Sequence, residues 1–361
     1  TWMLENGEWR AHNPGAAIRG YHISSLYSPL GWLSWSEIVE EWQAAQGNTA
    51  RLKQFVNTIL GETWKDKGDA PEWQRLYERR EPYQRNHVPR GALFLTAGVD
   101  VQKDRLEVEV VGWGRRMHSW SIDYRVFMGD TADIDGPTSP WRKLDAMLAE
   151  QWPSAYGVPM PLSVMAVDTG YQTQTAYNWC RKHARNRVMP IKGQDRAATL
   201  IGAPKAVDVN AGGRRISRGL KLWLVGTDLA KSELYGWLKQ ERPAGETPDA
   251  ELPVGWCHFP EYQDEYFRQL TAEQLLVKVV KGYRRYSWEK TRERNEALDC
   301  RMYNRAAAAM AGIDRFTDET WAQLETDLGL VKAREQNVNT VKPTTDSGGI
   351  RWKDDSSFWR G

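Results

Sequence analysis

Features that assign many proteins to a class at first reading are missing from this chain of 361 residues. It contains only three cysteines, too few for a disulfide framework, and this scarcity favours a reducing compartment. No apolar run approaches the ~18 residues that a membrane-spanning helix needs, and no signal peptide is recognisable. The sequence therefore predicts a protein without a membrane partner.

Motifs that would name a catalytic mechanism are absent as well. No G-x-x-x-x-G-K-[ST] phosphate-binding loop occurs, so ATP hydrolysis is not expected from this chain alone. No G-x-S-x-G motif supports a serine hydrolase. Cys180 and His183 have the C-x-x-H spacing of a zinc ligand pair, but no second C-x-x-C or H-x-x-x-H pair accompanies them. A zinc site is therefore a minor alternative to a core cysteine and a surface histidine.

A strong net charge is also lacking, because 49 basic side chains balance 47 acidic ones and leave +2. The basic residues are nevertheless concentrated in segments: six against one acidic residue in 181–196, five against one in 205–221, and eight against four in 281–305. Basic segments on an otherwise balanced surface are typical of a polyanion-binding site, although each one alone also fits a solvated face.

The two ends of the chain differ from its middle. Residues 1–88 are interpreted as a lead-in segment, and a stretch rich in Arg, Glu and Pro at 79–90 marks its boundary. Residues 316–361 are expected to form a short helix and a polar, flexible tail. The helices expected in the lead-in are 36–45 (with Ser36 as the N-cap), 49–59 and 71–80.

Residues 89–315 are predicted to form a mixed α/β domain. Three early antiparallel strands followed by helix, strand, helix and strand resemble the order of the ribonuclease H-like fold, a mixed sheet flanked by helices, here interrupted by an insert at 203–219. Strands are predicted at 91–101, 106–112, 118–127, 163–168, 187–191 and 220–225, with a strand pair at 274–286. Helices are predicted at 141–151, 173–183, 229–239, 262–270 and 293–311.

Two of the predicted strands end in aspartate, a residue that is poor in strands and costly to bury as an unpaired ion. Asp100 follows the apolar run ALFLTAGV and Asp168 follows LSVMAV, while Asp299 lies on the last long helix. If the two strands are neighbours in one sheet, their carboxyl ends lie about 5 Å apart, and the carboxylates repel each other unless a cation lies between them. Oxygen ligands favour Mg²⁺ or Mn²⁺ over zinc, and a third carboxylate would complete a site for two such ions ~3.5–4 Å apart.

Plainer interpretations of these residues stay open. A single aspartate after an apolar run is more often an ordinary turn or capping residue. Glu109 and Asp123 lie in alternating strands and could join the acidic cluster, although the alternation favours positions that face solvent. Lys231 follows a strand end and could contact a phosphate or the rim of the site.

Several longer segments resemble the large terminase subunit of lambda-like tailed phages. They are GYHISSLYSPLGWLSW (20–35), FVNTILGETW (55–64), TAGVDVQKDRLEVEVVGWG (96–114), VDTGYQT (167–173), LWLVGTDLAKSELYGWL (222–238) and NEALDCRMY (295–303). That family joins an N-terminal packaging ATPase to a C-terminal ribonuclease H-like endonuclease that cuts concatemeric viral DNA. The resemblance implies that residues 1–88 are the last piece or linker of the ATPase half, and that residues 89–315 are the endonuclease.

The resemblance also implies residue roles and partners. Asp100, Asp168 and Asp299 match the acidic nuclease positions and would hold two catalytic Mg²⁺ or Mn²⁺ ions. A β-hairpin that helps to hold double-stranded DNA is expected at 203–221. The other implied partners are the small terminase subunit and the portal of the prohead, in an oligomeric packaging complex in the host cytoplasm. With the charge distribution, the candidate DNA contacts are Arg214, Arg215, Arg218, Lys231, Arg284 and Arg285.

Three other functions remain as alternatives. A resolvase or transposase of the same fold would use a similar acidic cluster. A non-catalytic module that docks on DNA or on the portal would bind without cutting. A glycosidase, suggested by the 19 tryptophans, would place two carboxylates ~5–9 Å apart around a sugar and would ignore metal chelation.

Overall fold

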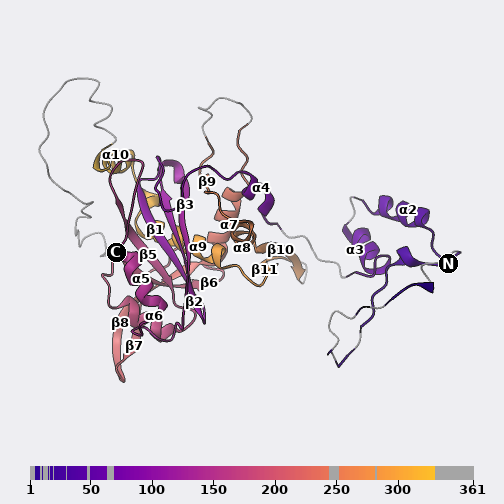
Figure 1. The fold of residues 1–361 in the computed structure, drawn as a ribbon, viewed down its shortest axis with the longest axis horizontal. Coiled ribbons are helices and arrows are strands. Elements are labelled where there is room, and N and C mark those ends of the chain that lie inside the picture. The colour runs from indigo at the N-terminus through magenta and orange to yellow at the C-terminus, as the bar shows by residue number, and fades with distance from the viewer. Residues whose placement is uncertain are drawn as a thin grey trace, which may run out of the picture. The chain divides into compact units, whose positions relative to one another are not determined.

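The computed structural model describes residues 5–8, 10, 15, 17–18, 20–29, 31–46, 49–62, 69–243, 252–280 and 283–329. The chain forms two compact units that divide after Gly68 (Figure 1). The sequence placed this boundary at residue 88, but α4 (Trp73–Glu78) buries Leu76 against α8 (Asp264–Leu270) of the larger unit. Residues 69–88 therefore fold with the larger unit.

The smaller unit is built around two helices, α2 (Trp35–Ala45) and α3 (Thr49–Thr58). Ser34 is the N-cap of α2: its Oγ accepts from the Glu37 backbone N–H at 3.3 Å, and Glu37 Oε2 accepts from the Ser34 N–H at 2.7 Å. The prediction of Ser36 as the cap is wrong, because only Ser34 has a glutamate three residues later to complete a capping box.

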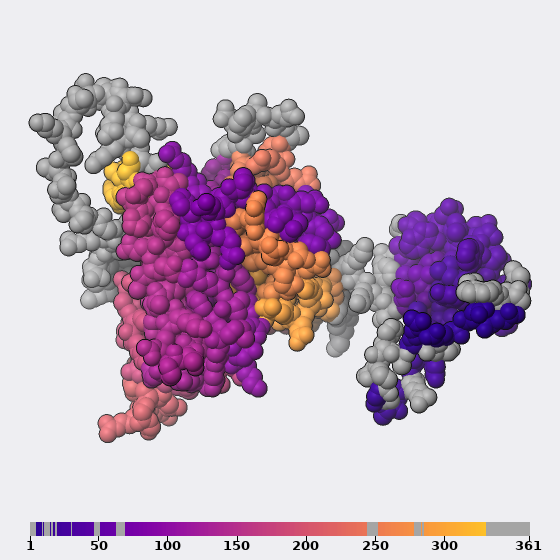
Figure 2. All heavy atoms as spheres, in the orientation of Figure 1, coloured from indigo at the N-terminus to yellow at the C-terminus, as the bar shows by residue number. Residues whose placement is uncertain are grey.

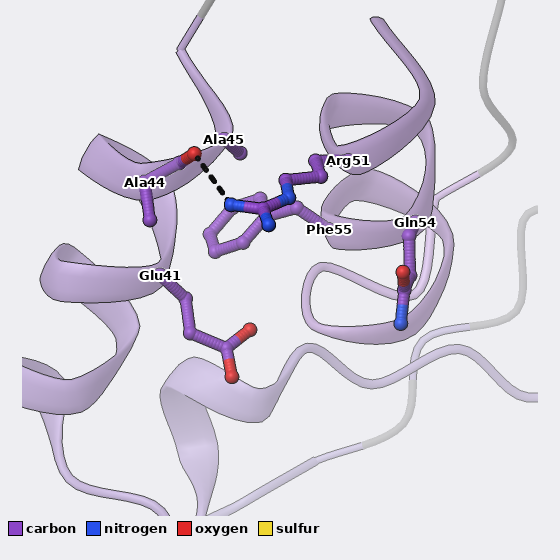
Figure 3. A pocket seen from close by; sticks show the side chains of 6 residues that line it. All are labelled: Glu41, Ala44, Ala45, Arg51, Gln54 and Phe55. Atoms are coloured by element: carbon purple, nitrogen blue, oxygen red, sulfur yellow. Dashed lines mark hydrogen bonds between the residues drawn. The ribbon is translucent and has the colours of Figure 1, made fainter. Parts of the chain in front are cut away.

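A small pocket lies between α2 and α3 (Figure 3). Arg51 Nη1 donates to the Ala44 carbonyl oxygen at 3.5 Å, which joins the start of α3 to the end of α2. Phe55 is buried and its ring centroid lies 5.3 Å from that of Trp42. A single carboxylate among the lining side chains gives no set of metal ligands. The pocket is lined by Glu41, Ala44, Ala45, Arg51, Gln54 and Phe55.

The larger unit contains one mixed sheet, with nine strands among the residues described. β1, β2 and β3 form an antiparallel meander, whereas β1, β5, β6 and β8 run parallel to one another. The strand order is β7-β8-β6-β5-β1-β2-β3-β9, with β4 paired to β5, which is the mixed α/β sheet predicted for a ribonuclease H-like fold (Figure 1). The strands are β1 (Phe94–Val101), β2 (Arg105–Trp113), β3 (Ser119–Met128), β4 (Gln151–Trp152), β5 (Met160–Asp168), β6 (Val188–Gln194), β7 (Lys205–Ala211), β8 (Arg214–Gly226) and β9 (Cys257–His258).

Helices cover both faces of this sheet. On β5, Val164 and Ala166 pack in one cluster with Tyr303 of α9, whereas Met165 and Val167 pack in the cluster that contains α5 and α6. Successive strand side chains point to opposite faces, so α9 lies on one face and α5 and α6 lie on the other. The helices are α5 (Pro140–Ala149), α6 (Thr173–Cys180), α7 (Thr227–Leu238), α9 (Glu296–Met310) and α10 (Asp318–Asp327), with 3₁₀ turns η1 (Ser25–Tyr27), η2 (Arg115–Met117) and η3 (Ile313–Arg315).

α9 approaches β1 closely because Gly98 has no side chain. A Cβ at this position would stand 2.1 Å from the Cys300 carbonyl oxygen and 2.7 Å from the Asn304 backbone nitrogen. Thr96 Oγ1, on the same face of β1, donates to Asn304 Oδ1 at 2.8 Å. α9 therefore crosses β1 at Gly98, with its first turn toward the carboxyl end of the strand.

The predicted insert forms the β7–β8 hairpin, whose tip projects from the body of the larger unit (Figure 2). Gly212 and Gly213 make its two-residue turn with φ of 56° and 74°, values that glycine adopts without strain. β8 continues beyond the hairpin and pairs with β6 from Trp223 to Gly226. The strand predicted at 220–225 is therefore the second half of one long strand.

A second hairpin and a last helix were also predicted, and both are present. β10 (Glu273–Val280) and β11 (Tyr283–Lys290) form the expected strand pair as a separate antiparallel hairpin. α10 buries Trp321 and Leu324 in the main core, so the chain after residue 315 still packs on the domain. Residues 330–361 of the predicted tail lie outside the described residues. None of the helices in the described ranges is long and apolar enough to cross a membrane.

Candidate active site

Asp100 and Asp168 stand at the carboxyl ends of adjacent parallel strands. β1 and β5 pair in register up to Val99 and Val167, so the two aspartates are the next residues along neighbouring strands. Their side chains share the face of Gly98, because strand side chains alternate, and this is the face that α9 covers. Only 4% of Asp100 and 8% of Asp168 is exposed. The structure thus brings together the two strand ends that the sequence singled out.

Asp299 approaches the same point from the first turn of α9. Its neighbour Cys300 lies over Gly98, two residues before Asp100 on β1. The Asp299 side chain is partly buried, and its Oδ2 accepts from Asn295 Nδ2 at 3.0 Å. The third acidic residue therefore faces the strand ends across the interface between helix and sheet.

Burial and neighbouring charges together leave the pKa of each of the three carboxyl groups above its usual value. Burial raises the pKa of Asp100 well above its usual value, and the negative charges of Asp299 and Asp168 raise it further. Burial raises the pKa of Asp168 to about 6, and burial together with the charges of Glu273 and Asp168 raises the pKa of Asp299 to about 7. The pKa of Tyr303 is raised by burial and, in addition, by the negative charge of each of the three aspartates. The charges of all three acidic groups therefore act on one buried tyrosine.

The donor chemistry of this cluster fits a hard divalent cation. Buried carboxylates that repel one another are stabilised by a cation between them, and all-oxygen donors suit Mg²⁺ or Mn²⁺. Within the described ranges, however, no three Asp, Glu, His or Cys side chains are already arranged as a group that could hold a metal ion. One oxygen of each aspartate accepts a hydrogen bond instead. These bonds run from Gln102 Nε2 to Asp100 Oδ2 (2.6 Å), from Gly170 N to Asp168 Oδ2 (3.1 Å) and from Asn295 Nδ2 to Asp299 Oδ2 (3.0 Å).

Lysines lie around the acidic cluster. Lys192 lowers the pKa of Asp168, and Lys231 and Lys290 lower that of Asp299, in each case against the effect of burial. Lys231 is largely buried, and its Nζ lies 2.6 Å from Glu273 Oε2. The structure therefore places this predicted DNA contact beside the acidic cluster and in an ion pair.

Glu273 and Asn295 are parts of this site that the sequence analysis did not single out. Glu273 begins β10 and is 3% exposed, and Asn295 immediately precedes α9. The only signal for Asn295 is its spacing of four residues from Asp299, which puts both side chains on one side of the helix. No comparable pattern marks Glu273, because its role depends on how the β10–β11 hairpin packs against α7 and α9.

The expectation that Glu109 and Asp123 face solvent is wrong, since they are 0% and 1% exposed. α9 covers the side of β2 that carries Glu109, and Arg301 of α9 neutralises it with Nη1 2.8 Å from Oε1. Asp123 is paired with Arg125 at 2.5 Å. Both acidic residues are thus engaged by arginine in structural ion pairs.

A further acidic residue, Glu107, stands directly opposite Asp100 in the β1–β2 register. Arg105 Nε and Arg294 Nη2 lie 2.6 Å and 2.7 Å from its Oε1. Both arginines also contact Glu296 of α9. The two guanidinium groups join β2 to α9 by pairing with both carboxylates, although the charge of Glu296 still contributes to the raised pKa of Asp100.

The predicted DNA-contacting arginines lie on two hairpins. Arg215 of β8 is 76% exposed at its side chain and forms an ion pair with Asp208 of β7, with Nη2 2.5 Å from Oδ2. Arg285 is exposed on β11, whereas the side chain of Arg284 lies outside the described residues. The exposed arginines of the β7–β8 hairpin are Arg214, Arg215 and Arg218.

The C-x-x-H pair agrees only in part with the plainer interpretation of a core cysteine and a surface histidine, because only 20% of the His183 side chain is exposed. Cys180 is a buried free cysteine on α6. His183 Nε2 lies 3.1 Å from Asp145 Oδ1. Neither belongs to a group of potential metal ligands in the part of the chain that the structure describes.

Comparison with known proteins identifies relatives of this chain. A family model described as the terminase large subunit gpA, endonuclease domain, matches residues 18–321. The chain is 37% identical over 313 residues to the large terminase subunit of Escherichia phage lambda, covering 85% of this chain and 45% of that protein. It is 33% identical over 364 aligned positions to the large terminase subunit of Enterobacteria phage P21, covering 94% and 52%.

No solved structure gave a significant match to the chain. The chain spans about half the length of the two curated relatives. Because the family model covers most of the sequence, the chain belongs to the family of the terminase large subunit gpA, endonuclease domain.

Proposed function

We propose that this chain is a metal-dependent endonuclease of a phage packaging terminase, which cuts concatemeric viral DNA by two-metal hydrolysis. Asp100 and Asp168 end adjacent parallel strands, and Asp299 lies in the first turn of α9, which crosses β1 at Gly98; this arrangement is the observation that supports the proposal. The endonuclease description of the family supports the same reaction.

In this proposal the three aspartates hold two divalent cations, Mg²⁺ or Mn²⁺. Such ions supply positive charge that activates the attacking water and stabilises the leaving oxygen of a phosphodiester. The raised pKa values of the aspartates support this role, because crowded buried carboxylates gain most from a nearby cation. The hydrogen bonds from Gln102 and Asn295 each fix one carboxylate oxygen, which limits rotation of the donors.

Double-stranded DNA is the proposed substrate, and the basic side chains support it. Exposed arginines on the β7–β8 hairpin and on β11 offer guanidinium groups that bind phosphate oxygens. Lys192 and Lys231 beside the acidic cluster are suited to a phosphodiester that carries negative charge into the site. The proposed DNA contacts are Arg214, Arg215, Arg218, Lys231, Arg284 and Arg285.

The further partners proposed for this chain are the small terminase subunit, the portal of the prohead and additional copies of the chain, assembled in the host cytoplasm. Support for them comes from membership of the family alone.

Plasmid cleavage tests the proposed reaction. Supercoiled plasmid is incubated with the 361-residue chain and Mg²⁺ or Mn²⁺, and nicked and linear products are measured over time. We expect the substitutions Asp100→Asn, Asp168→Asn and Asp299→Asn each to lower the rate more than about a hundredfold, because each removes a charged donor from the cations. Chelation with EDTA should stop the reaction.

Asp135→Asn is the matched control, because Asp135 is exposed and contacts only Lys182 among the ion pairs described. It should cut at the rate of the unsubstituted chain. Cleavage that survives EDTA or all three active-site substitutions would contradict the proposal. DNA binding without any cleavage would favour a docking module, and a strong preference for four-way junctions over plasmid would favour a resolvase.

A further inference from the structure

Asp299 is connected by hydrogen bonds and an ion pair to residues outside the three aspartates. Asn295 Nδ2 donates to Asp299 Oδ2 at 3.0 Å and to Glu273 Oε1 at 3.0 Å. Asn295 Oδ1 accepts from Lys290 Nζ at 2.7 Å. Because the nitrogen donates twice and the oxygen accepts from an ammonium group, the orientation of this amide is set by its neighbours.

Glu273 is held as firmly as Asn295. Its Oε2 lies 2.6 Å from Lys231 Nζ, so each carboxylate oxygen has a partner. The Tyr235 hydroxyl donates to the Glu273 carbonyl oxygen at 2.9 Å and accepts from its N–H at 3.2 Å. Two side chains of α7 therefore fix the first residue of β10, and Glu273 in turn fixes Asn295.

Asn295 makes these contacts from a position where its side chain would ordinarily do something else. It precedes the first residue of α9, and asparagine at an N-cap usually accepts from a backbone N–H of the first turn. Here the side chain makes no such cap. The amide is directed instead to Asp299, Glu273 and Lys290, which belong to three different elements.

We propose that Asn295 and Glu273 are positioning residues for Asp299, which hold its carboxylate in the orientation that binds a divalent cation. Asn295 acts directly on Asp299, and Glu273 acts through Asn295, with Lys231 balancing its charge. The role deepens the proposed nuclease function and rests on it.

The physical reason is the rotation of a carboxylate about its last side-chain bond. A cation that binds a freely rotating carboxylate must stop that rotation, whereas a hydrogen bond from a fixed amide stops it beforehand. Residues that orient metal ligands in this way typically contribute about 10–100-fold to metal affinity or activity. Glu273 itself is not proposed as a ligand, because Asn295 and Lys231 already engage its two oxygens.

Mn²⁺ binding to the 361-residue chain without DNA, followed by calorimetry, tests this role apart from catalysis. Asn295→Ala and Glu273→Gln should each raise the Mn²⁺ dissociation constant, by about tenfold for Asn295→Ala. The double variant should bind as weakly as Asn295→Ala alone, since Glu273 acts through Asn295. In plasmid cleavage, the half-saturating Mn²⁺ concentration should rise by the same factor, while the rate at saturating Mn²⁺ changes less.

Gln323→Ala provides the control, because Gln323 is an exposed amide on α10. It should leave Mn²⁺ affinity unchanged. If Asn295→Ala and Glu273→Gln both bind Mn²⁺ with unchanged affinity, the positioning role is overturned, whether or not the variants unfold at a lower temperature. The nuclease proposal still stands in that case if the unsubstituted chain cuts. Additive losses in the double variant overturn the action of Glu273 through Asn295. An unsubstituted chain that neither binds Mn²⁺ nor cuts contradicts the nuclease proposal, and the positioning role with it.

Discussion

Gly98 of β1 faces Cys300 of α9 so closely that a methyl group on Gly98 would stand 2.1 Å from the Cys300 carbonyl oxygen. Asp100 lies two residues further along the same face of β1, and Asp299 directly precedes Cys300. This backbone contact therefore sets how near the first and third acidic residues stand to each other.

Gly98→Ala should destabilise the protein and displace α9, because carbonyl and backbone nitrogen atoms cannot yield as a flexible side chain can. Overpacking of this kind costs about 1–3 kcal/mol or more. Gly236→Ala is the matched control: it lies inside α7, and an added Cβ meets nothing within 4 Å. That change should stabilise the protein by roughly 0.5–1 kcal/mol. Thermal unfolding measures both, and equal melting temperatures for the two variants would contradict the close approach.

The strand ends of the site were predictable because they depend on local patterns. Apolar runs that end in Asp100 and Asp168 fixed both the strands and the position of the acidic residue at each end. That the two ends are neighbours followed only from the order of elements, which resembles the ribonuclease H-like fold. The sequence placed Asp299 on a helix. Its position opposite Asp100 depends on the contact between α9 and Gly98, which sequence alone does not show.

Burial of the other acidic residues was not predictable in the same way. Alternation in β2 indicated one polar face, and polar faces of strands usually meet water. Here Glu107 and Glu109 lie under α9, where arginines from distant parts of the chain pair with them. Asn295 and Glu273 were missed for the same reason, because their contacts join residues whose proximity arises only from packing.

Protonation of the active-site aspartates gives a prediction about the metal-free protein. The pKa of Asp168 is raised to about 6 and that of Asp299 to about 7. A carboxyl group with a raised folded-state pKa favours folding below its unfolded pKa of about 3.9, and this contribution is lost as pH rises through the folded value. Asp299→Asn, which stays neutral, should therefore become more stable than the unsubstituted chain as pH rises from 4 to 8.

The difference should reach the order of a few kcal/mol and level off above about pH 7. Urea unfolding of both proteins in EDTA at several pH values measures it, and taking the difference cancels the titrating groups whose pKa does not depend on the charge of Asp299. Mn²⁺ at about a hundred times its dissociation constant should add about 2.7 kcal/mol to the unsubstituted chain and less to the variant. A difference that shrinks with rising pH would show that Asp299 is not a buried, crowded carboxyl group.

The β7–β8 hairpin gives a prediction about salt dependence. Each lost phosphate contact should reduce the slope of log affinity against log salt by about 0.9. Replacing Arg214, Arg215 and Arg218 together by alanine should therefore flatten the slope by roughly 2–3 and weaken binding. Arg215→Ala alone should have the smallest effect, since this side chain already pairs with Asp208.

Binding of a duplex fragment without divalent cations, followed by fluorescence anisotropy at several salt concentrations, provides the measurement. Arg142→Ala is the control, because Arg142 is an exposed arginine on α5. It should leave the slope unchanged. An unaltered slope in the triple variant would show that the hairpin does not contact phosphates.

The ion pair between Glu109 and Arg301 gives a test of whether Glu109 stabilises the fold or takes part in cleavage. Glu109 Oε1 accepts from Arg301 Nη1 at 2.8 Å, Ser121 Oγ at 2.6 Å and the Tyr266 hydroxyl at 2.7 Å. Arg301→Met should cost about 3–5 kcal/mol in urea unfolding, because it leaves a buried carboxylate without its cation. Adding Glu109→Gln should recover much of this loss, since the double variant buries no unpaired charge. The same double variant tests the role of Glu109 in cleavage. If Glu109 only stabilises the fold, the double variant should still cut plasmid with Mn²⁺ at close to the normal rate. A double variant that is stably folded and yet inactive would instead place Glu109 among the residues on which cleavage depends.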